Sequence, residues 1–454
     1  MYSSSITSLS KETKLFLENT IFLTITGFLN RFLGFYYRIF LNKKIGSAGM
    51  GIYQQIFPLT ALCHAFAIGG ITVAISKLVS EYTRKEQDKY QRQLLSTGFF
   101  LSFLFSVFTG VILYHTSYFL AVNIYKEPQL YPLFQLLSLS FPFSALHACI
   151  CGYYYGQKKM LLPSLSMLLE QLARIFSIML IFRIFEACHK PTGIHIALIG
   201  SLIGEMVSSL FMATCYFYGR KLPKYSFRLH TITKHIQRKF TLSKSILTLS
   251  IPVSSNRFVL SLLQSAEALL LPMALVSFGF NKSQALSLYG AFAAMALPVL
   301  LFPTTLINSM ATVLLPSVSE QQALGNGAKL TQLMQKSLFL SFLFGCGLNF
   351  IFLCFGKWIG LFLFSDAVCG NYLQKIAFIA PFLCASTTLE SILNGLGKMA
   401  GCFFSNLCSI FLRLVFVVFV MPKLGMNGYF IGLLTSQILL CLLHLRNLKK
   451  ASLL

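Results

Sequence analysis

Two arginines lie seven residues apart in the first long apolar stretch of the sequence, Arg31 and Arg38 in the run RFLGFYYR. On an α-helix seven residues turn through about 700°, so the two guanidinium groups leave the helix in directions about 20° apart. An arginine at the centre of a bilayer costs about 2.5–3.5 kcal/mol on insertion scales, and it usually faces a water-filled cavity, a partner or an anionic ligand. The spacing therefore predicts a stacked pair of cations on the path of a negatively charged substrate. For Arg38, near the outer end of the stretch, the alternative is that the side chain extends to the lipid headgroups.

Other apolar stretches also contain charged side chains. The further cations are Arg174, Arg257 and Arg413, and the acids are Glu170, Glu205, Glu267 and Glu390. We interpret the arginines as candidate substrate contacts and the acids as candidate coupling or pairing groups. Glu170 precedes Arg174 by four residues, which favours an ion pair within one helix. For Glu267 the alternatives are a protonatable coupling site and a neutral or inter-helix-paired glutamate, and for Arg413 they are an inter-helix pair and a place in a cavity wall.

The elements that carry these residues are predicted to be membrane-spanning helices. Of the 454 residues 56% are hydrophobic and 11% are charged, and the mean hydropathy is +0.71, whereas soluble chains carry about 25% charged residues. Windows of about 20 apolar residues predict twelve spans, at 16–41, 52–78, 94–119, 131–155, 160–184, 193–218, 245–274, 285–312, 332–355, 372–396, 400–420 and 427–446. The first is too long for a cleaved signal peptide and ends in charge, so we expect it to remain as an anchor.

The net charge of +24 is concentrated in a few predicted loops. Basic residues cluster in 79–93, in 219–244 and at 446–450, and these segments share one side of the membrane if the N-terminus is cytoplasmic. Cytoplasmic loops carry an excess of Lys and Arg, so both termini are predicted to be cytoplasmic, in a multi-pass protein of the cell membrane. The same charges attract anionic lipid headgroups, and nucleic acid is not an expected partner.

The sequence contains no recognisable enzyme or metal motif. Its 12 cysteines include no C-x-x-C pair, and we interpret them as free thiols that pack like small apolar side chains. No phosphate-binding loop, HExxH helix or GxSxG elbow occurs, and Asp88 and Asp366 both lie in predicted loops. We therefore expect no catalytic activity, no metal and no cofactor. Energy for transport would come from an ion gradient, the membrane potential or the substrate gradient.

The chain is predicted to consist of two six-helix lobes, 1–218 and 245–454, joined by a basic cytoplasmic linker at 219–244. An even number of spans in each half makes the halves parallel repeats, related by an axis along the membrane normal. Paired lobes around a cavity favour alternating access over a pore.

Two internal marks support this repeat. The second span of each half has a tyrosine near its beginning, Tyr53 or Tyr289, and is followed by Val-Ser-Glu, at 79–81 or at 318–320. The fourth span of each half ends in a glycine-containing turn before lysine and methionine, GYYYGQKKM at 152–160 and NGLGKM at 394–399. Both marks fall in the same order in the two halves, as expected of repeated lobes.

Several of these stretches resemble the stage V sporulation protein B family. The resemblance rests on RFLGFYYR at 31–38, GSAGMGIY at 46–53, GITVAISKLVSE at 70–81, SIP at 250–252 and the stretch 288–320, and it extends over nearly the whole chain. That family belongs to a superfamily with multidrug and toxin extruders, oligosaccharide flippases and lipid II flippases. The resemblance implies an all-α membrane fold in which two six-helix lobes form a V around a central cavity. It also implies flipping of an undecaprenyl-pyrophosphate-linked saccharide, such as a cell-wall precursor.

The resemblance also bears on single residues and on partners. In the related lipid II flippases first-helix arginines line a cationic cavity; Arg31 fits that pattern, whereas Arg38 lies one residue away from that spacing. Lipid II flippases carry two further C-terminal helices, so we expect no lipid-tail groove built from such helices here. The implied partners are a lipid-linked anionic saccharide, membrane lipids and cell-wall synthesis enzymes, with Na⁺ or H⁺ as the candidate coupling ion.

Two other functions fit the same composition. An ion-coupled multidrug or organic-cation antiporter of this fold would use buried acids, and the four glutamates above are available for it. The third hypothesis is a non-transporting scaffold of an envelope-synthesis complex, but a scaffold would not need buried cations. The excess of arginines favours flipping of an anionic lipid-linked saccharide.

Overall fold

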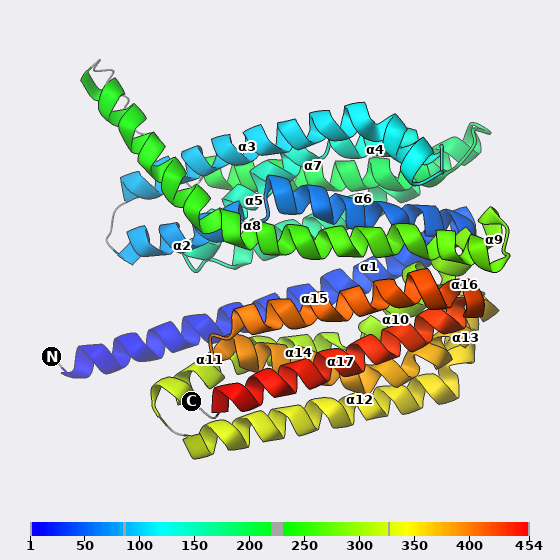
Figure 1. Ribbon diagram of the computed structural model, residues 1–454. Helices are drawn as coiled ribbons and strands as arrows, with labels where there is room; N and C mark the ends of the chain where they lie inside the picture. The colour runs from blue at the N-terminus through cyan, green and yellow to red at the C-terminus, as the bar shows by residue number, and fades with distance from the viewer. Residues whose placement is uncertain (1, 85–87, 219–229, 326, 453–454) are drawn as a thin grey trace. The chain divides into compact units, whose positions relative to one another are not determined.

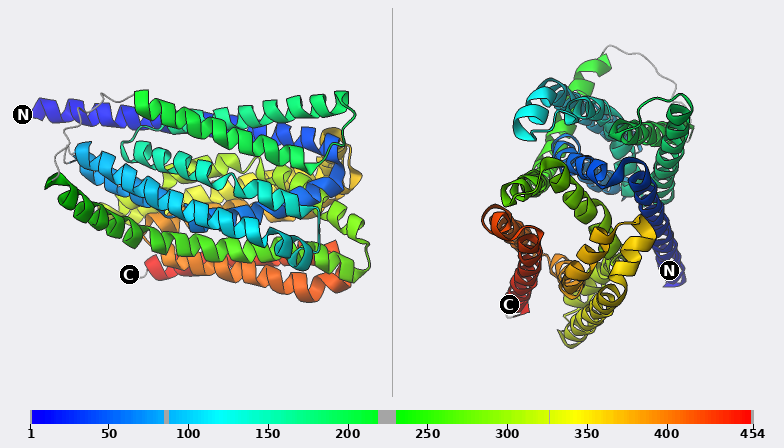
Figure 2. Two further views of the ribbon diagram at one scale, coloured as in Figure 1. Left: turned by 90° about the horizontal axis from the view of Figure 1, so that it is seen from above. Right: turned by 90° about the vertical axis from the view of Figure 1, so that its right-hand side faces the viewer.

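The computed structural model describes residues 2–84, 88–218, 230–325 and 327–452, and every regular element in these ranges is a helix. Residues 219–229 of the predicted linker lie outside the described residues. Within each part of the chain most of the long helices have nearly parallel axes (Figures 1 and 2). The all-helical membrane fold expected from the sequence is confirmed.

The helices follow one another through short turns. In chain order they are α1 Tyr2–Ala67, α2 Ile71–Arg84, α3 Asp88–Phe119, α4 Leu130–Ser138, α5 Phe141–Gly156, α6 Leu161–Ala187, α7 Ile194–Tyr218, α8 His230–Phe278, α9 Lys282–Gly290, α10 Leu297–Leu301, α11 Thr305–Ala323, α12 Gly327–Phe364, α13 Ala367–Ile376, α14 Ala380–Gly395, α15 Met399–Val415, α16 Met421–Leu424 and α17 Met426–Ser452. Between them lie π-helical turns, η1 Leu120–Ile124, η2 Ala291–Ala296 and η4 Phe416–Val420, and the 3-10 turn η3 Ala377–Ile379.

The described helices include nine to eleven candidate membrane spans, against the twelve predicted. Nine are long and apolar enough to cross a bilayer, and two bent pairs, Ile25–Ala67 with Ile71–Thr83 and Leu130–Ser138 with Phe141–Gly156, raise the number to eleven. The first pair covers most of the first predicted span and the second one, and between these two spans lies a kink at Gly46, where φ is 70°. Glycine adopts such a φ without steric cost, so α1 carries one span and the beginning of the next.

The outward faces of these helices are apolar. Phe176, Phe350 and Phe362 are exposed to 71%, 67% and 70%. Soluble monomers rarely expose broad apolar surfaces, whereas a membrane helix presents such side chains to the hydrocarbon. Exposed aromatic residues of this kind are typical of membrane-spanning helices.

The chain divides into two compact units. Unit 1 comprises Met1–Tyr37 and Leu59–Ser261, and unit 2 comprises Arg38–Pro58 and Leu262–Leu454. Residues 38–58 therefore pack with the C-terminal half of the chain, and residues 245–261 pack with the N-terminal half. The lobe boundaries predicted at 218 and 245 differ from this division and stay a prediction.

Close backbone contacts explain why residues 38–58 pack in unit 2 and residues 245–261 pack in unit 1. In unit 2 a Cβ atom on Gly51 would lie 2.1 Å from the carbonyl oxygen of Leu286, and the hydroxyl oxygens of Ser47 and Ser287 are 2.6 Å apart. In unit 1 a Cβ atom on Gly70 would lie 2.1 Å from the carbonyl oxygen of Ser250. Small residues let membrane helices approach this closely.

The marks that are repeated in the sequence make the same contact in each unit. In unit 1 a Cβ atom on Gly156 of α5 would lie 2.7 Å from Cβ of Val79 on α2. In unit 2 a Cβ atom on Gly395 of α14 would lie 3.0 Å from Cβ of Val318 on α11. Each valine belongs to one of the two Val-Ser-Glu sequences, and each glycine ends the helix before the next predicted span. The same helix crossing therefore occurs once in each unit.

Candidate functional site

Unit 1 contains a polar cluster on α6. Nη2 of Arg174 lies 2.5 Å from Oε1 of Glu170, and Nη1 of Arg174 donates to Oε1 of Gln171 at 3.2 Å. The two charged side chains are 21% and 23% exposed, so the pair lies at the edge of the protein interior. The intrahelical ion pair predicted from the four-residue spacing is present.

A second acid lies close to this pair. Glu205 of α7 accepts a short hydrogen bond from the hydroxyl of Ser144 on α5. The adjacent Gly204 lets α7 approach α6, because a Cβ atom there would lie 2.9 Å from the carbonyl oxygen of Glu170. Three helices of unit 1 thus bring two carboxyl groups and the Arg174 guanidinium into one region.

Arg257 is anchored to a helix break within unit 1. Its Nη1 donates to the carbonyl oxygen of Gly69 at 2.7 Å, and the Gly70 amide donates to Oγ of Ser254 at 2.9 Å. Residues 68–70 form the turn between α1 and α2, where backbone groups lose their regular helical partners. A carbonyl group orients the guanidinium but leaves its positive charge in place, and Arg257 is exposed.

The first-helix arginines belong to different units. Arg31 lies in unit 1 and is exposed, whereas Arg38 lies in unit 2 and is half-buried. Nη1 of Arg38 donates to the carbonyl oxygen of Ala294 at 3.3 Å. Ala294 belongs to η2, and single π-helical turns of this kind are frequent at functional sites. The described helix is continuous between the two arginines, as the seven-residue spacing requires.

Unit 2 contains a buried charge network. Nη2 of Arg413 on α15 lies 3.0 Å from Oε2 of Glu267 on α8, and the Tyr429 hydroxyl of α17 donates to Oε1 of Glu267 at 2.9 Å. The Tyr429 ring packs edge-on against Phe292 of η2, with centroids 5.1 Å apart. Both Glu267 and Tyr429 are buried. Of the alternatives left open by the sequence, the structure shows inter-helix pairing for both Glu267 and Arg413.

The remaining candidate acid is Glu390 of α14, which contacts a residue outside this network. Its Oε1 accepts a hydrogen bond from Nδ2 of Asn406 on α15 at 3.3 Å. Within the described residues no group of three or more His, Cys, Asp or Glu side chains could hold a metal ion.

The structure adds partners that the sequence did not identify. Tyr429 and Ser144 hold candidate acids, and the carbonyl groups of Gly69 and Ala294 hold candidate arginines. A double glycine such as that at 69–70 favours a break in a helix, but nothing in the sequence indicated that Arg257 would bind there. A tyrosine or a serine within an apolar run has no local pattern that shows which acid it contacts.

The sequence of the chain matches a known family over most of its length. A family model described as polysaccharide biosynthesis protein matches residues 16–322. The chain belongs to this family.

Individual relatives extend the comparison. Stage V sporulation protein B of Bacillus subtilis (strain 168) is 25% identical over 451 residues, which cover 96% of this chain and 84% of that protein. The resemblance noted in the sequence to the stage V sporulation protein B family is confirmed.

Solved structures of transporters share the fold. An inward-facing multidrug resistance transporter of the MATE family, in the MOP superfamily, has a TM-score of 0.73 at 14% identity and covers 93% of this chain and 95% of that one. The lipid II flippase MurJ in an inward closed conformation has a TM-score of 0.66 at 18% identity and covers 95% of this chain and 89% of that one. This family member is therefore a multi-pass membrane protein with the fold of MOP superfamily transporters.

Proposed function

We propose that this chain is a flippase that moves an undecaprenyl-pyrophosphate-linked saccharide across the cytoplasmic membrane by alternating access. The carrying observation is Arg257, an exposed guanidinium held at 2.7 Å by the Gly69 carbonyl group within a membrane helix. A pyrophosphate group carries several negative charges, and the planar guanidinium binds such oxygens through two parallel hydrogen bonds. Arg257 is thus oriented for an anion while its charge remains available.

The state of the acids supports the same proposal. Glu170 and Glu267 each form an ion pair with an arginine, Arg174 and Arg413. A carboxylate that already neutralises a guanidinium is a poor site for an organic cation, because removing either partner leaves an unpaired charge. The antiporter reading loses two of its candidate acids in this way. Glu205 and Glu390 remain available to it, with Ser144 and Asn406 as their described partners.

The name of one structural neighbour, MurJ, supports the proposed substrate class. MurJ is named as a lipid II flippase, and a lipid-linked anionic saccharide is the substrate that the arginines of this chain suit. Na⁺ or H⁺ as the coupling ion and cell-wall synthesis enzymes as partners belong to the same proposal. The prenyl tail would remain in the lipid while the headgroup crosses.

The test is headgroup translocation of a fluorescent undecaprenyl-pyrophosphate sugar in proteoliposomes. We expect Arg257→Ala and Arg31→Ala to lower the protein-dependent rate about tenfold or more, since a hydrogen bond to a charged group contributes about 1.5–3 kcal/mol. Arg257→Lys keeps the charge but lacks the planar fork, and should retain part of the rate. Arg183→Ala, which removes an exposed arginine of α6 outside these clusters, is the matched control and should flip normally.

Two results would contradict the proposal. One is equal loss of flipping in Arg183→Ala and Arg257→Ala, which would show that flipping depends on the net charge of the protein and not on the position of Arg257. The other is no flipping by the intact protein together with Na⁺- or H⁺-linked efflux of organic cations that Glu205→Gln abolishes. That second result would establish the antiporter.

A further inference from the structure

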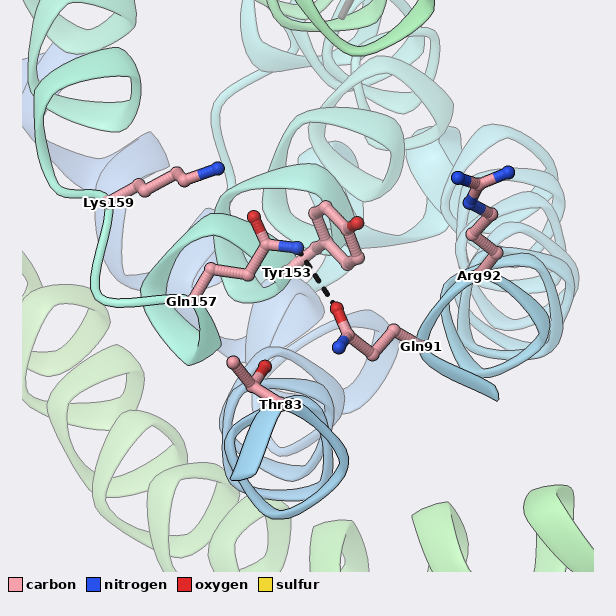
Figure 3. A pocket seen from close by; sticks show the side chains of 6 residues that line it. All are labelled: Thr83, Gln91, Arg92, Tyr153, Gln157 and Lys159. Carbon is pink, nitrogen blue, oxygen red and sulfur yellow. Dashed lines mark hydrogen bonds between the residues drawn. The ribbon is translucent and has the colours of Figure 1, made fainter. Parts of the chain in front are cut away.

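A polar pocket lies within unit 1 where α2, α3 and α5 end or begin. It has a volume of about 310 Å³, and its lining residues are Thr83, Gln91, Arg92, Tyr153, Gln157 and Lys159. Small-molecule sites typically have volumes of about 300–1,000 Å³, so this α2–α3–α5 pocket has room for a small headgroup. Its residues come from separate helices and from the turn after α5 (Figure 3).

The lining is cationic and rich in neutral polar groups. Lys159 and Arg92 lie on opposite sides, with the two amides and the Tyr153 hydroxyl between them (Figure 3). Nε2 of Gln157 donates to Oε1 of Gln91 at 3.0 Å, and Gln91 is buried. This hydrogen bond fixes the two amides and so holds the floor of the pocket in one arrangement. Two cations about a polar centre are the pattern that an anion requires.

No carboxylate is among the described residues that line the pocket. Two acids are near these residues in the sequence: Glu81, two positions before Thr83 on α2, and Asp88, four positions before Arg92 at the start of α3. Two helical residues are separated by about 200° around the axis, so Glu81 leaves α2 on the opposite face.

Tyrosine rings lie next to the pocket. Tyr82 stacks on Tyr90 with centroids 5.6 Å apart, and Tyr153 contacts Tyr216 edge-on at 5.5 Å. Tyrosine is enriched where membrane helices meet the headgroup layer. The pocket residues Thr83, Gln91 and Arg92 belong to the segment 79–93, which the distribution of basic residues predicts to be cytoplasmic.

We propose that the α2–α3–α5 pocket binds a phosphate or pyrophosphate group at the predicted cytoplasmic face of unit 1. Arg92 would bind the anion through its planar fork and Lys159 through its ammonium group. The group could be carried by a lipid headgroup or by a soluble phosphate compound, because the chemistry that the pocket recognises is the same. The inference concerns residues other than the membrane arginines and does not depend on the proposed transport.

The test compares two double variants of the full chain in nanodiscs. Arg92→Ala/Lys159→Ala removes the pocket cations, and Lys336→Ala/Lys398→Ala removes two exposed lysines of unit 2 with the same change in net charge. Binding of inorganic pyrophosphate to each protein is measured by calorimetry in neutral phosphatidylcholine discs. Retention of phosphatidylglycerol is measured by native mass spectrometry, and thermal unfolding confirms that each variant is folded. If the alanine variant does not fold, Arg92→Gln/Lys159→Gln replaces it.

We expect the pocket variant to lose at least tenfold in affinity for pyrophosphate, or to lose bound phosphatidylglycerol, while the unit 2 variant stays within twofold of the intact protein. Loss of pyrophosphate binding identifies a soluble phosphate compound as the source. Loss of lipid retention alone identifies a headgroup. Equal losses in both variants, or no loss in either assay, would overturn the proposal.

Discussion

Arginines within these membrane helices have two kinds of partner. Arg174 and Arg413 contact carboxylates, whereas Arg38 and Arg257 donate to backbone carbonyl groups. A carboxylate cancels the positive charge, while a carbonyl dipole only orients it. The partner, more than the presence of arginine, therefore distinguishes a residue that holds the fold from one that can bind an anion.

The first residue-scale prediction concerns the buried network of unit 2. Arg413→Met leaves Glu267 as an uncompensated charge beside Tyr429, and breaking a buried pair in this way costs about 3–5 kcal/mol. We expect a clear fall in Tm, measured by thermal unfolding in detergent. Arg413→Met/Glu267→Gln removes both charges and should recover part of the loss.

The matched comparison is Arg174→Met in unit 1. Its i,i+4 pair with Glu170 is partly exposed and links residues of one helix, and such pairs contribute about 0.3–0.5 kcal/mol. Its Tm should therefore fall much less. An equal fall in both single variants would show that Arg413 does not connect helices of unit 2 through Glu267.

At the scale of elements, the crossing between α2 and α5 and that between α11 and α14 depend on the absence of a side chain. The carbonyl oxygen of Ser76 lies 2.6 Å from the position of a Cβ atom on Gly156, and that of Leu315 lies 2.8 Å from the position on Gly395. Backbone atoms cannot move away as a flexible side chain can. Each helix pair would therefore have to separate if a methyl group were added.

Gly156→Ala and Gly395→Ala should each destabilise the protein by about 1–3 kcal/mol, the usual cost of overpacking. Gly347→Ala on α12 is the control, since nothing lies within 4 Å of its Cβ position. Alanine in an open helical position is favourable by up to about 1 kcal/mol. Thermal unfolding of the three variants is the measurement, and a Gly347 variant as unstable as the other two would disprove the repeated close crossing.

At the scale of the whole molecule, the distribution of basic residues predicts one orientation in the membrane. With a cytoplasmic N-terminus, the turn after the fifth predicted span faces outward and the turn after the tenth faces the cytoplasm. Cys188 lies in the first turn and is exposed, and Lys398 lies in the second and is also exposed. These two positions can report the orientation.

A membrane-impermeant maleimide should label Cys188 in intact cells, and Cys188→Ser should remove that label. Thiols in the hydrocarbon layer react poorly because maleimide attacks the thiolate, which low polarity disfavours. In the Cys188→Ser background, Lys398→Cys should be labelled only after the membrane is permeabilised. The reverse orientation would be established by two results together: no labelling of Cys188 in intact cells that contain the unmodified protein, and labelling of the Cys188→Ser/Lys398→Cys variant in intact cells.

The sequence by itself determined the fold class, most of the membrane spans and the Glu170–Arg174 pair. Each depends on local information: apolar length sets a span, and a four-residue spacing brings two side chains together on any helix. The repeated Val-Ser-Glu and glycine marks likewise indicated two repeated halves, and the structure added that these marks meet at a helix crossing in each unit.

Only the tertiary structure decided which side chains meet across helices. Glu267 contacts Arg413 and Tyr429, each from a different helix, and Arg257 donates to the Gly69 carbonyl at a helix break. The direction and depth at which helices pack set such contacts, and residues far apart in the chain carry no spacing that encodes them. Packing also places residues 38–58 in unit 2 and residues 245–261 in unit 1, because glycine and serine in these segments let the helix backbones come close together. Composition and spacing thus specify which helices form and which charges they carry, whereas the packing of those helices selects the partner of each charge.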